Sequence, residues 1–226
     1  MRHFDDRSAQ HLAFLKRTDL DNTRLAVFVH GFRGGYLSTW GALPDLLYKN
    51  ADTDRCFRDW DYLFLGYSTW DIDTYLDISD LLSTEVRSAL KGERPYGQPY
   101  KEIALIGHSL GTLGIRQFLC SWSLSDPPLI AAVKSVTLFG SPGEGSPLAG
   151  LATPLYSVAS ALKPKNPQLR MLKEWTCGAH SVNRWPQPRL VIGKRDWGGK
   201  TGGKTGRAGK RASLNCALFP LLIPAP

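Results

Sequence analysis

The stretch that decides the fold is EIALIGHSLG, residues 102–111. Residues 102–107 are almost continuously apolar, which is typical of a parallel β-strand covered by helices on both faces. Residues 110–122 are rich in helix formers and carry apolar side chains at helical spacing, namely Leu113, Phe118 and Leu119. The sequence therefore predicts a strand, a sharp turn and a helix in immediate succession.

The turn between this strand and this helix has the pattern G-x-S-x-G, with Ser109 at its centre. Gly107 and Gly111 let the chain bend sharply, so we expect Ser109 to have a strained backbone conformation and to stand exposed above the sheet. The N-terminus of the following helix stabilises negative charge at this point. Ser109 is therefore the candidate nucleophile, and His108 is interpreted as a residue that packs within the turn.

Other segments predict the rest of the sheet. Short apolar runs at residues 25–29, 62–65, 135–140 and 190–193 indicate four more strands, and residues 73–90 have the spacing of an amphipathic helix. Strands that alternate with helices favour right-handed crossovers. We therefore expect an α/β fold, with a mostly parallel sheet and helices on both faces.

The loop after the first of these strands contains His30, Gly31 and Phe32, followed by a second glycine-bearing stretch at residues 33–35. Attack on an ester places negative charge on an oxygen, and each backbone N–H donor aimed at that oxygen lowers the barrier by about 3 kcal/mol. The N–H groups of Phe32 and Leu110 are the candidate oxyanion-hole donors. His30 is interpreted as a structural histidine that bonds the backbone of its loop.

The His-Gly-Phe loop and the G-x-S-x-G turn, each placed after a strand, resemble the α/β-hydrolase family, in particular its lipase and esterase branch. The resemblance covers about residues 25–196. It implies a fold that is reduced at the N-terminus and incomplete at the C-terminus, and hydrolysis of carboxylic esters through an acyl-enzyme on Ser109. The substrate would be a small-molecule or lipid ester, and serine acyl transfer requires no metal and no organic cofactor.

The family's chain order places an acid after the serine and a histidine last. Asp196 follows the strand at residues 190–193 and is the candidate acid, with Glu144 as the alternative. The five histidines are His3, His11, His30, His108 and His180, so none follows Asp196. His180 serves as the base only if its loop folds back over Ser109. Without a base the serine is a poor nucleophile, so the triad is incomplete in sequence order.

The character of the chain changes at Trp197 to the low-complexity run GGKTGGKTGRAGKR and a proline-rich end. We expect residues 1–196 to form the hydrolase core and residues 197–226 to be a disordered tail. Our hypothesis is that a reading-frame change or truncation replaced the last strand and its histidine loop, which sequencing of the coding DNA tests. The net charge of +8 is concentrated near this tail, so we expect no nucleic-acid partner.

Composition excludes several other classes. A chain of 226 residues suits a single domain, and its four cysteines form no CxxC pair that would indicate a metal site. The N-terminal segment does not resemble a signal peptide, and the apolar end of the chain is too short and proline-broken to span a membrane. We therefore expect a cytoplasmic protein without an integral membrane segment, while the oligomeric state stays open.

Two other functions compete with ester hydrolysis. Residues 198–205 match the phosphate-loop pattern GxxxxGK[ST], but no helix or acid-bearing strand is predicted after them. A non-catalytic hydrolase-like protein that binds a ligand or partner is the stronger alternative, because no histidine completes the triad. Five aromatic residues lie near the predicted carboxyl ends of the strands and either line an acyl pocket or pack in the core: Tyr36, Trp40, Tyr67, Trp70 and Tyr75.

Overall fold

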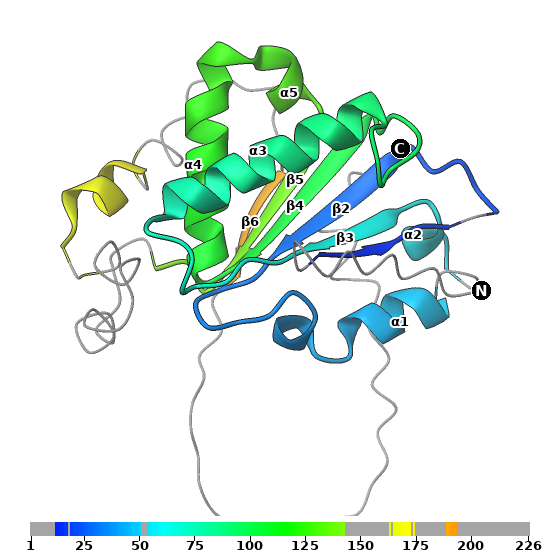
Figure 1. Ribbon diagram of the computed structural model, residues 1–226, viewed down its shortest axis with the longest axis horizontal. Coiled ribbons are helices and arrows are strands. Elements are labelled where there is room, and N and C mark those ends of the chain that lie inside the picture. The colour runs from blue at the N-terminus through cyan, green and yellow to red at the C-terminus, as the bar shows by residue number, and fades with distance from the viewer. Residues whose placement is uncertain are drawn as a thin grey trace, which may run out of the picture.

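A computed structural model describes residues 12–17, 19–50, 54–142, 163, 165–172, 174 and 189–193. Strands and helices alternate along most of this part of the chain, as Figure 1 shows. The elements are β1 (Ala13–Leu15), β2 (Arg24–Val29), η1 (Ser38–Trp40), α1 (Leu43–Asn50), α2 (Arg55–Arg58), β3 (Asp61–Leu65), α3 (Tyr75–Lys91), β4 (Glu102–His108), α4 (Leu110–Ser125), α5 (Pro127–Ala131), β5 (Val133–Phe139) and β6 (Arg189–Gly193).

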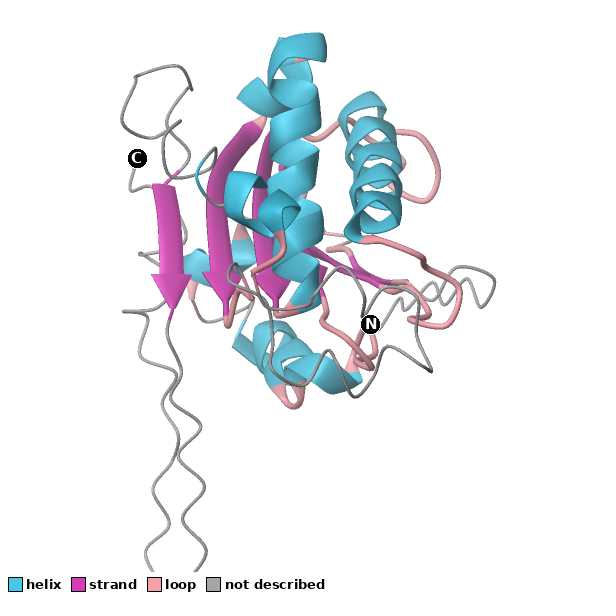
Figure 2. Cartoon of the chain, turned by 90° about the vertical axis from the view of Figure 1, so that its left-hand side faces the viewer, coloured by secondary structure: helices cyan, strands magenta, loops and turns pink. Residues whose placement is uncertain are grey.

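The strands form one sheet in the order β1-β3-β2-β4-β5-β6. Only β1 runs antiparallel to its neighbour, and every other pairing in the sheet is parallel. The shared direction of β4, β5 and β6 can be followed in Figure 2. The predicted α/β architecture with a mostly parallel sheet is therefore confirmed.

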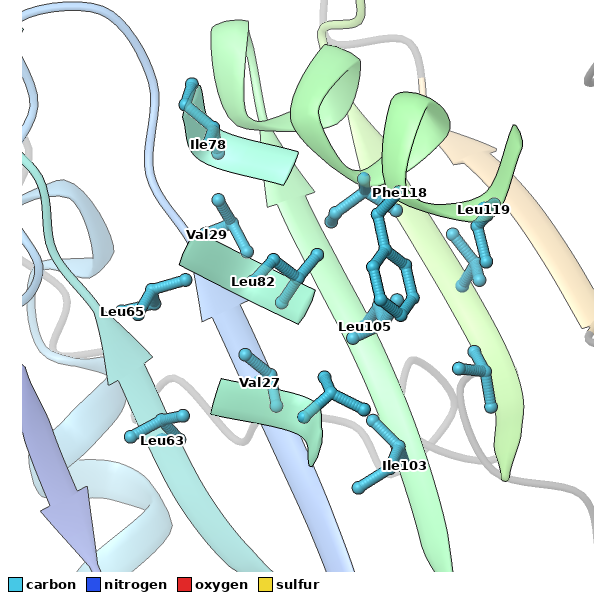
Figure 3. Packing of buried hydrophobic residues seen from close by; sticks show 14 of the residues in the cluster. Val27, Val29, Leu63, Leu65, Ile78, Leu82, Ile103, Leu105, Phe118 and Leu119 are labelled. Carbon is cyan, nitrogen blue, oxygen red and sulfur yellow. The ribbon is translucent and has the colours of Figure 1, made fainter. Parts of the chain in front are cut away.

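Alternate residues of the central strands point to opposite faces of the sheet, as the two-residue period of a strand requires. One face packs against α3, α4 and α5, and the other packs against α1 and α2 (Figure 1). On the α3 and α4 side, Val27, Leu63 and Leu105 are completely buried beneath Leu82 and Phe118 (Figure 3). Full burial of such side chains stabilises the fold by about 1.5–3 kcal/mol each. The sheet is thus held between two apolar layers.

The helix predicted at residues 73–90 begins two residues later, at Tyr75, because Thr74 caps it. Thr74 Oγ1 accepts a hydrogen bond from Leu76 N at 3.1 Å, and Asp77 Oδ2 accepts one from Thr74 N at 2.8 Å. This reciprocal pair satisfies backbone N–H groups that the helix itself leaves without acceptors. The helix therefore starts at a defined residue, at the end of the loop that follows β3.

Some elements were not predicted from the sequence. These are β1, which has only three residues, and the short helices η1, α1, α2 and α5. Conversely, the predicted tail at residues 197–226 lies outside the described residues. Within the described part of the chain, no helix is both long and apolar enough to cross a bilayer.

Candidate active site

Ser109 lies at the junction between β4 and α4 and has φ 51° and ψ −118°. A positive φ is unfavourable for a residue with a Cβ, and such strained conformations are concentrated at functional sites. Ser109 is also the N-cap of α4, a position where serine hydroxyls usually bond the first turn of the helix, yet its side chain makes no capping hydrogen bond. The helix therefore does not use the hydroxyl of this half-buried serine.

Gly107 and Gly111, on either side of Ser109, lie where the neighbouring atoms leave no room for a Cβ. A Cβ on Gly111 would lie 2.4 Å from both Val29 O and His30 O, which are backbone atoms at the end of β2. A Cβ on Gly107 would lie 3.1 Å from Thr112 Cα and 2.8 Å from a side-chain carbon of Ile115. The first turn of α4 consequently lies directly on the end of β2. Gly111 is thus explained by the contact of α4 with the end of β2, and Gly107 by the contact of β4 with the first turns of α4.

The loop after β2 reaches Ser109 through Gly31. A Cβ on Gly31 would lie 2.7 Å from Ser109 Cβ and 3.0 Å from His108 O, so only glycine fits against the turn. The two segments that the sequence singled out are therefore neighbours in space. Phe32 follows Gly31 directly and is half-buried, while Leu110 is the first residue of α4, where helix N–H groups have no partner within the helix.

His30 is completely buried and uses both ring nitrogens within this region. Its Nδ1 lies 2.8 Å from Gly31 O and must donate to that carbonyl, and its Nε2 accepts a hydrogen bond from Tyr67 N at 3.2 Å. Burial is the main reason why the pKa of His30 lies below its usual value. His30 is therefore a neutral residue bonded to the backbone, and not a base for Ser109.

Residues that the sequence did not single out tie the turn to the end of β5. Ser109 N donates to Phe139 O at 2.9 Å. The hydroxyl of Thr112 donates to Ser109 O at 2.6 Å and shares a second hydrogen bond of 2.9 Å with Ser141 Oγ. The backbone of Ser109 is thus fixed at both its amide and its carbonyl. Nothing in the pattern of the sequence marks Thr112 or Ser141 for this role.

Three candidate residues lie outside the described residues: Asp196, Glu144 and His180. Their positions relative to Ser109 therefore stay predictions. In the part of the chain that is described, no three metal-ligating side chains come together. Cys56 and Cys120 are both free thiols.

The aromatic residues near the carboxyl ends of the strands mostly pack in the interior. Tyr67 stacks on His30 with ring centroids 4.0 Å apart, and Trp40 meets Phe28 edge to face at 5.0 Å. Tyr75, the first residue of α3, is buried in the core, whereas Trp70 has 66% of its surface exposed. Tyr67 and Tyr75 are therefore buried in the interior, which leaves fewer candidates for an acyl pocket.

A second buried polar cluster lies at the opposite, amino edge of the sheet, around Asp61 at the start of β3. Asp61 is completely buried, and its carboxylate accepts hydrogen bonds from Tyr100 Oη, from Asn22 Nδ2 at 3.0 Å and from Arg17 N at 3.1 Å. Burial raises the pKa of Asp61, and the hydrogen bond from Tyr100 partly opposes this. The cluster joins the starts of β2, β3 and β4, at the edge of the sheet opposite to Ser109.

Comparison with known structures supports the architecture. The chain is similar to the mature lipase BlEst2 of Bacillus licheniformis, with a TM-score of 0.55 and 15% identity over 80% of this chain and 70% of that one. It is also similar to the phospholipase PlaB of Legionella pneumophila in complex with thio-NAD, with a TM-score of 0.57 and 21% identity. That match covers 75% of this chain but only 37% of PlaB. Similarity at these identities shows the α/β-hydrolase fold.

Sequence comparison identifies the family. No curated protein matches the chain. Residues 19–158, however, match the family described as "Putative serine esterase (DUF676)", and this segment includes β2, the loop after it, and the turn that carries Ser109. The match extends over more than half of the 226 residues. The chain therefore belongs to this serine esterase family and has the α/β-hydrolase fold of its lipase and esterase structural neighbours.

Proposed function

We propose that the chain hydrolyses carboxylic esters through an acyl-enzyme on Ser109. The observation that carries this proposal is the backbone of Ser109, which is held at positive φ between β4 and α4 while Gly31 lies against its Cβ. An ordinary helix cap needs neither the strain nor the contact. A serine that attacks an ester needs a presented hydroxyl and neighbouring backbone donors, and this arrangement supports both requirements.

In the proposed reaction, Ser109 Oγ attacks the carbonyl carbon of the ester while a base takes the hydroxyl proton. The C–O bond of the ester then breaks, and the base passes this proton to the alcohol that leaves. The N–H groups of Phe32 and Leu110 bind the oxygen that becomes negative, and water then releases the acid from Ser109. Asp196 is the proposed acid that orients the base, with Glu144 as the alternative. His180 is the only histidine that follows Ser109 in the sequence, which makes it the proposed base. Lipid and small-molecule esters are both suitable substrates for this chemistry.

The direct test is covalent labelling by a fluorophosphonate probe together with hydrolysis of p-nitrophenyl esters of short and long acyl chains. Wild-type protein should be labelled, and Ser109→Ala should abolish labelling and lower kcat by about 10⁴-fold or more. Ser121→Ala is a matched control, because Ser121 is an exposed serine later in the same helix. Labelling that persists in Ser109→Ala would contradict the proposal.

A second candidate function is the binding of a ligand or partner without catalysis. The observation that favours it is that His180 precedes Asp196, whereas the family's chain order places the histidine after the acid. It predicts that wild-type protein is neither labelled nor active, although it is folded. His180→Ala is a further test of the first function. It should reduce hydrolysis strongly if His180 is the base, and it should leave hydrolysis unchanged if His180 is not the base.

A further inference from the structure

We propose that Tyr67 is a positioning residue for ester hydrolysis: through His30, its amide and hydroxyl groups hold the peptide group whose N–H is the proposed oxyanion donor. This inference rests on the proposed function, because it assigns a role within the same site. Tyr67 itself does not touch the reacting atoms. It lies just after β3, two strands away from Ser109 in the order of the sheet.

The first step is the contact between Tyr67 and His30. The hydroxyl of Tyr67 donates to His30 O at 2.5 Å, its amide donates to His30 Nε2 at 3.2 Å, and the two rings stack with an interplanar angle of 16°. Both residues are buried. Three separate contacts therefore fix the main chain, the ring orientation and the tautomer of His30 together.

The second step is the tautomer. Because Nε2 accepts the amide proton of Tyr67, the neutral ring carries its own proton on Nδ1. Nδ1 then donates to Gly31 O at 2.8 Å, and Gly34 N donates to the same oxygen at 3.0 Å. The Gly31 carbonyl is consequently held by two donors, one of which depends on the main-chain amide of Tyr67.

The third step follows from the geometry of the peptide bond. Gly31 C=O and Phe32 N–H belong to one planar trans group and point in opposite directions. Fixing the carbonyl of Gly31 therefore fixes the direction of the Phe32 N–H, the proposed oxyanion donor. Gly31 also lies against Ser109 Cβ, so this peptide group is adjacent to the nucleophile. The series of contacts runs from Tyr67 through His30 and Gly31 to the Phe32 N–H.

The chain offers a matched control for the loss of the Tyr67 hydroxyl. Tyr62 is buried to a similar extent, with 4% of its surface exposed compared with 8% for Tyr67. Its hydroxyl likewise donates to a backbone carbonyl, Phe57 O, at 2.8 Å. Tyr62 lies on the sheet face that packs against α1 and α2. Tyr62→Phe should therefore lose the same kind of hydrogen bond without altering the peptide group beside Ser109.

The experiment measures kcat and KM for ester hydrolysis by Tyr67→Phe and Tyr62→Phe, with thermal melts to verify folding. Tyr67→Phe removes the hydrogen bond to His30 O and keeps the amide bond to Nε2. Loss of that bond should loosen the main chain at His30 and misalign the adjoining peptide group. We expect kcat and kcat/KM to fall equally, by roughly 10-fold, because a misaligned donor weakens an interaction made in the transition state. Tyr62→Phe should keep the wild-type kcat. Equal kcat values in the two variants, or a loss that appears only in KM, would overturn the inference.

Variants of His30 provide a second, independent measurement. His30→Leu removes the donor to Gly31 O and should lower kcat by roughly 10²-fold. His30→Asn should recover part of that loss, because its amide nitrogen takes the place of Nδ1. Equal kcat values for the two His30 variants would also overturn the inference. A wild-type chain without hydrolysis would instead refute the proposed function, whereas activity that is insensitive to Tyr67 and His30 would refute the inference alone.

Discussion

Two buried polar clusters, one at each end of β3, differ in the groups that accept their hydrogen bonds. The amino-edge cluster consists of Asp61, Tyr100 and Asn22, and the carboxyl-edge cluster consists of His30 and Tyr67. Each places a tyrosine hydroxyl against a buried acceptor. At the amino edge the acceptor is a carboxylate that joins the starts of several segments. At the carboxyl edge the acceptors are a backbone carbonyl and an imidazole, beside the strained Ser109.

Under the proposed function, the two edges of the parallel sheet have different roles. The amino edge stabilises the fold, and the carboxyl edge also carries the reacting residues. Ligands of open α/β sheets bind beyond the carboxyl ends of the strands, where Ser109 lies. Under the proposed function, the polar contacts at this edge orient backbone groups as well as stabilise the fold. Contacts at the amino edge only need to stabilise it. Changes at the carboxyl-edge cluster should therefore affect catalysis beyond their effect on stability, and changes at the amino-edge cluster should not.

The largest effect is expected from Gly111→Ala, which adds a methyl group at the carboxyl edge. That group would meet the backbone oxygens of Val29 and His30, which cannot move without displacing the end of β2. We expect a loss of about 3 kcal/mol or more in the free energy of unfolding, together with loss of Ser109 labelling. Denaturant unfolding and fluorophosphonate labelling measure the two effects.

Gly41→Ala is the control for this change. Unlike Gly111, Gly41 has a positive φ, 57°, and nothing lies within 4 Å of the added Cβ. Only the backbone cost of about 1–2 kcal/mol should appear, with labelling retained. Similar stabilities for the two alanine variants would show that α4 is not packed tightly on the end of β2.

A smaller effect is expected from Asp61→Ala at the amino edge. It removes the acceptor of three donors and leaves the Tyr100 hydroxyl buried without it, which should cost about 2–3 kcal/mol in the free energy of unfolding. The folded variant should still be labelled at Ser109 at the wild-type rate. A reduced labelling rate in fully folded protein would contradict the division between the two edges.

The sequence predicted features with a local pattern and missed those that depend on contacts between distant residues. Long apolar runs located five strands correctly, because parallel strands covered on both faces carry a strong local signal. The three residues of β1 carry no such signal, and their strand conformation depends on pairing with β3. Ser109 and Gly111 could be predicted because the turn has a local pattern. The proposed role of Tyr67 could not be predicted, since it rests on a contact with His30 across 37 residues of sequence.

The smallest effects are in the dependence of stability on pH, and the two clusters should give opposite signs. Burial lowers the pKa of His30 below 6.5 in the folded state, so the unfolded chain takes up the proton first and His30 destabilises the fold as the pH falls below that value. Burial raises the pKa of Asp61 above 3.8, so the folded chain takes up the proton first. Asp61 therefore adds stability as the pH falls through its raised pKa towards 3.8.

Thermal melts as a function of pH separate these two contributions. His30→Asn should remove the decrease in melting temperature below about pH 6.5, and Asp61→Asn should remove the increase at more acidic pH. The difference between each variant and the wild type, measured at every pH, isolates the single group. Curves for both variants that run parallel to the wild-type curve would contradict the burial of the two groups.

The short strand β1 affects whether the sheet can pair with a strand from another molecule. Its three residues pair antiparallel with Tyr62, Leu63 and Phe64, along the side of β3 that faces away from β2. Strand β3 is buried throughout and apolar apart from Asp61. Uncovered, its row of N–H and C=O groups would be a template for a strand from another chain. Ala13–Leu15 occupies this row, and a terminal strand of only three residues is itself a poor template for further pairing.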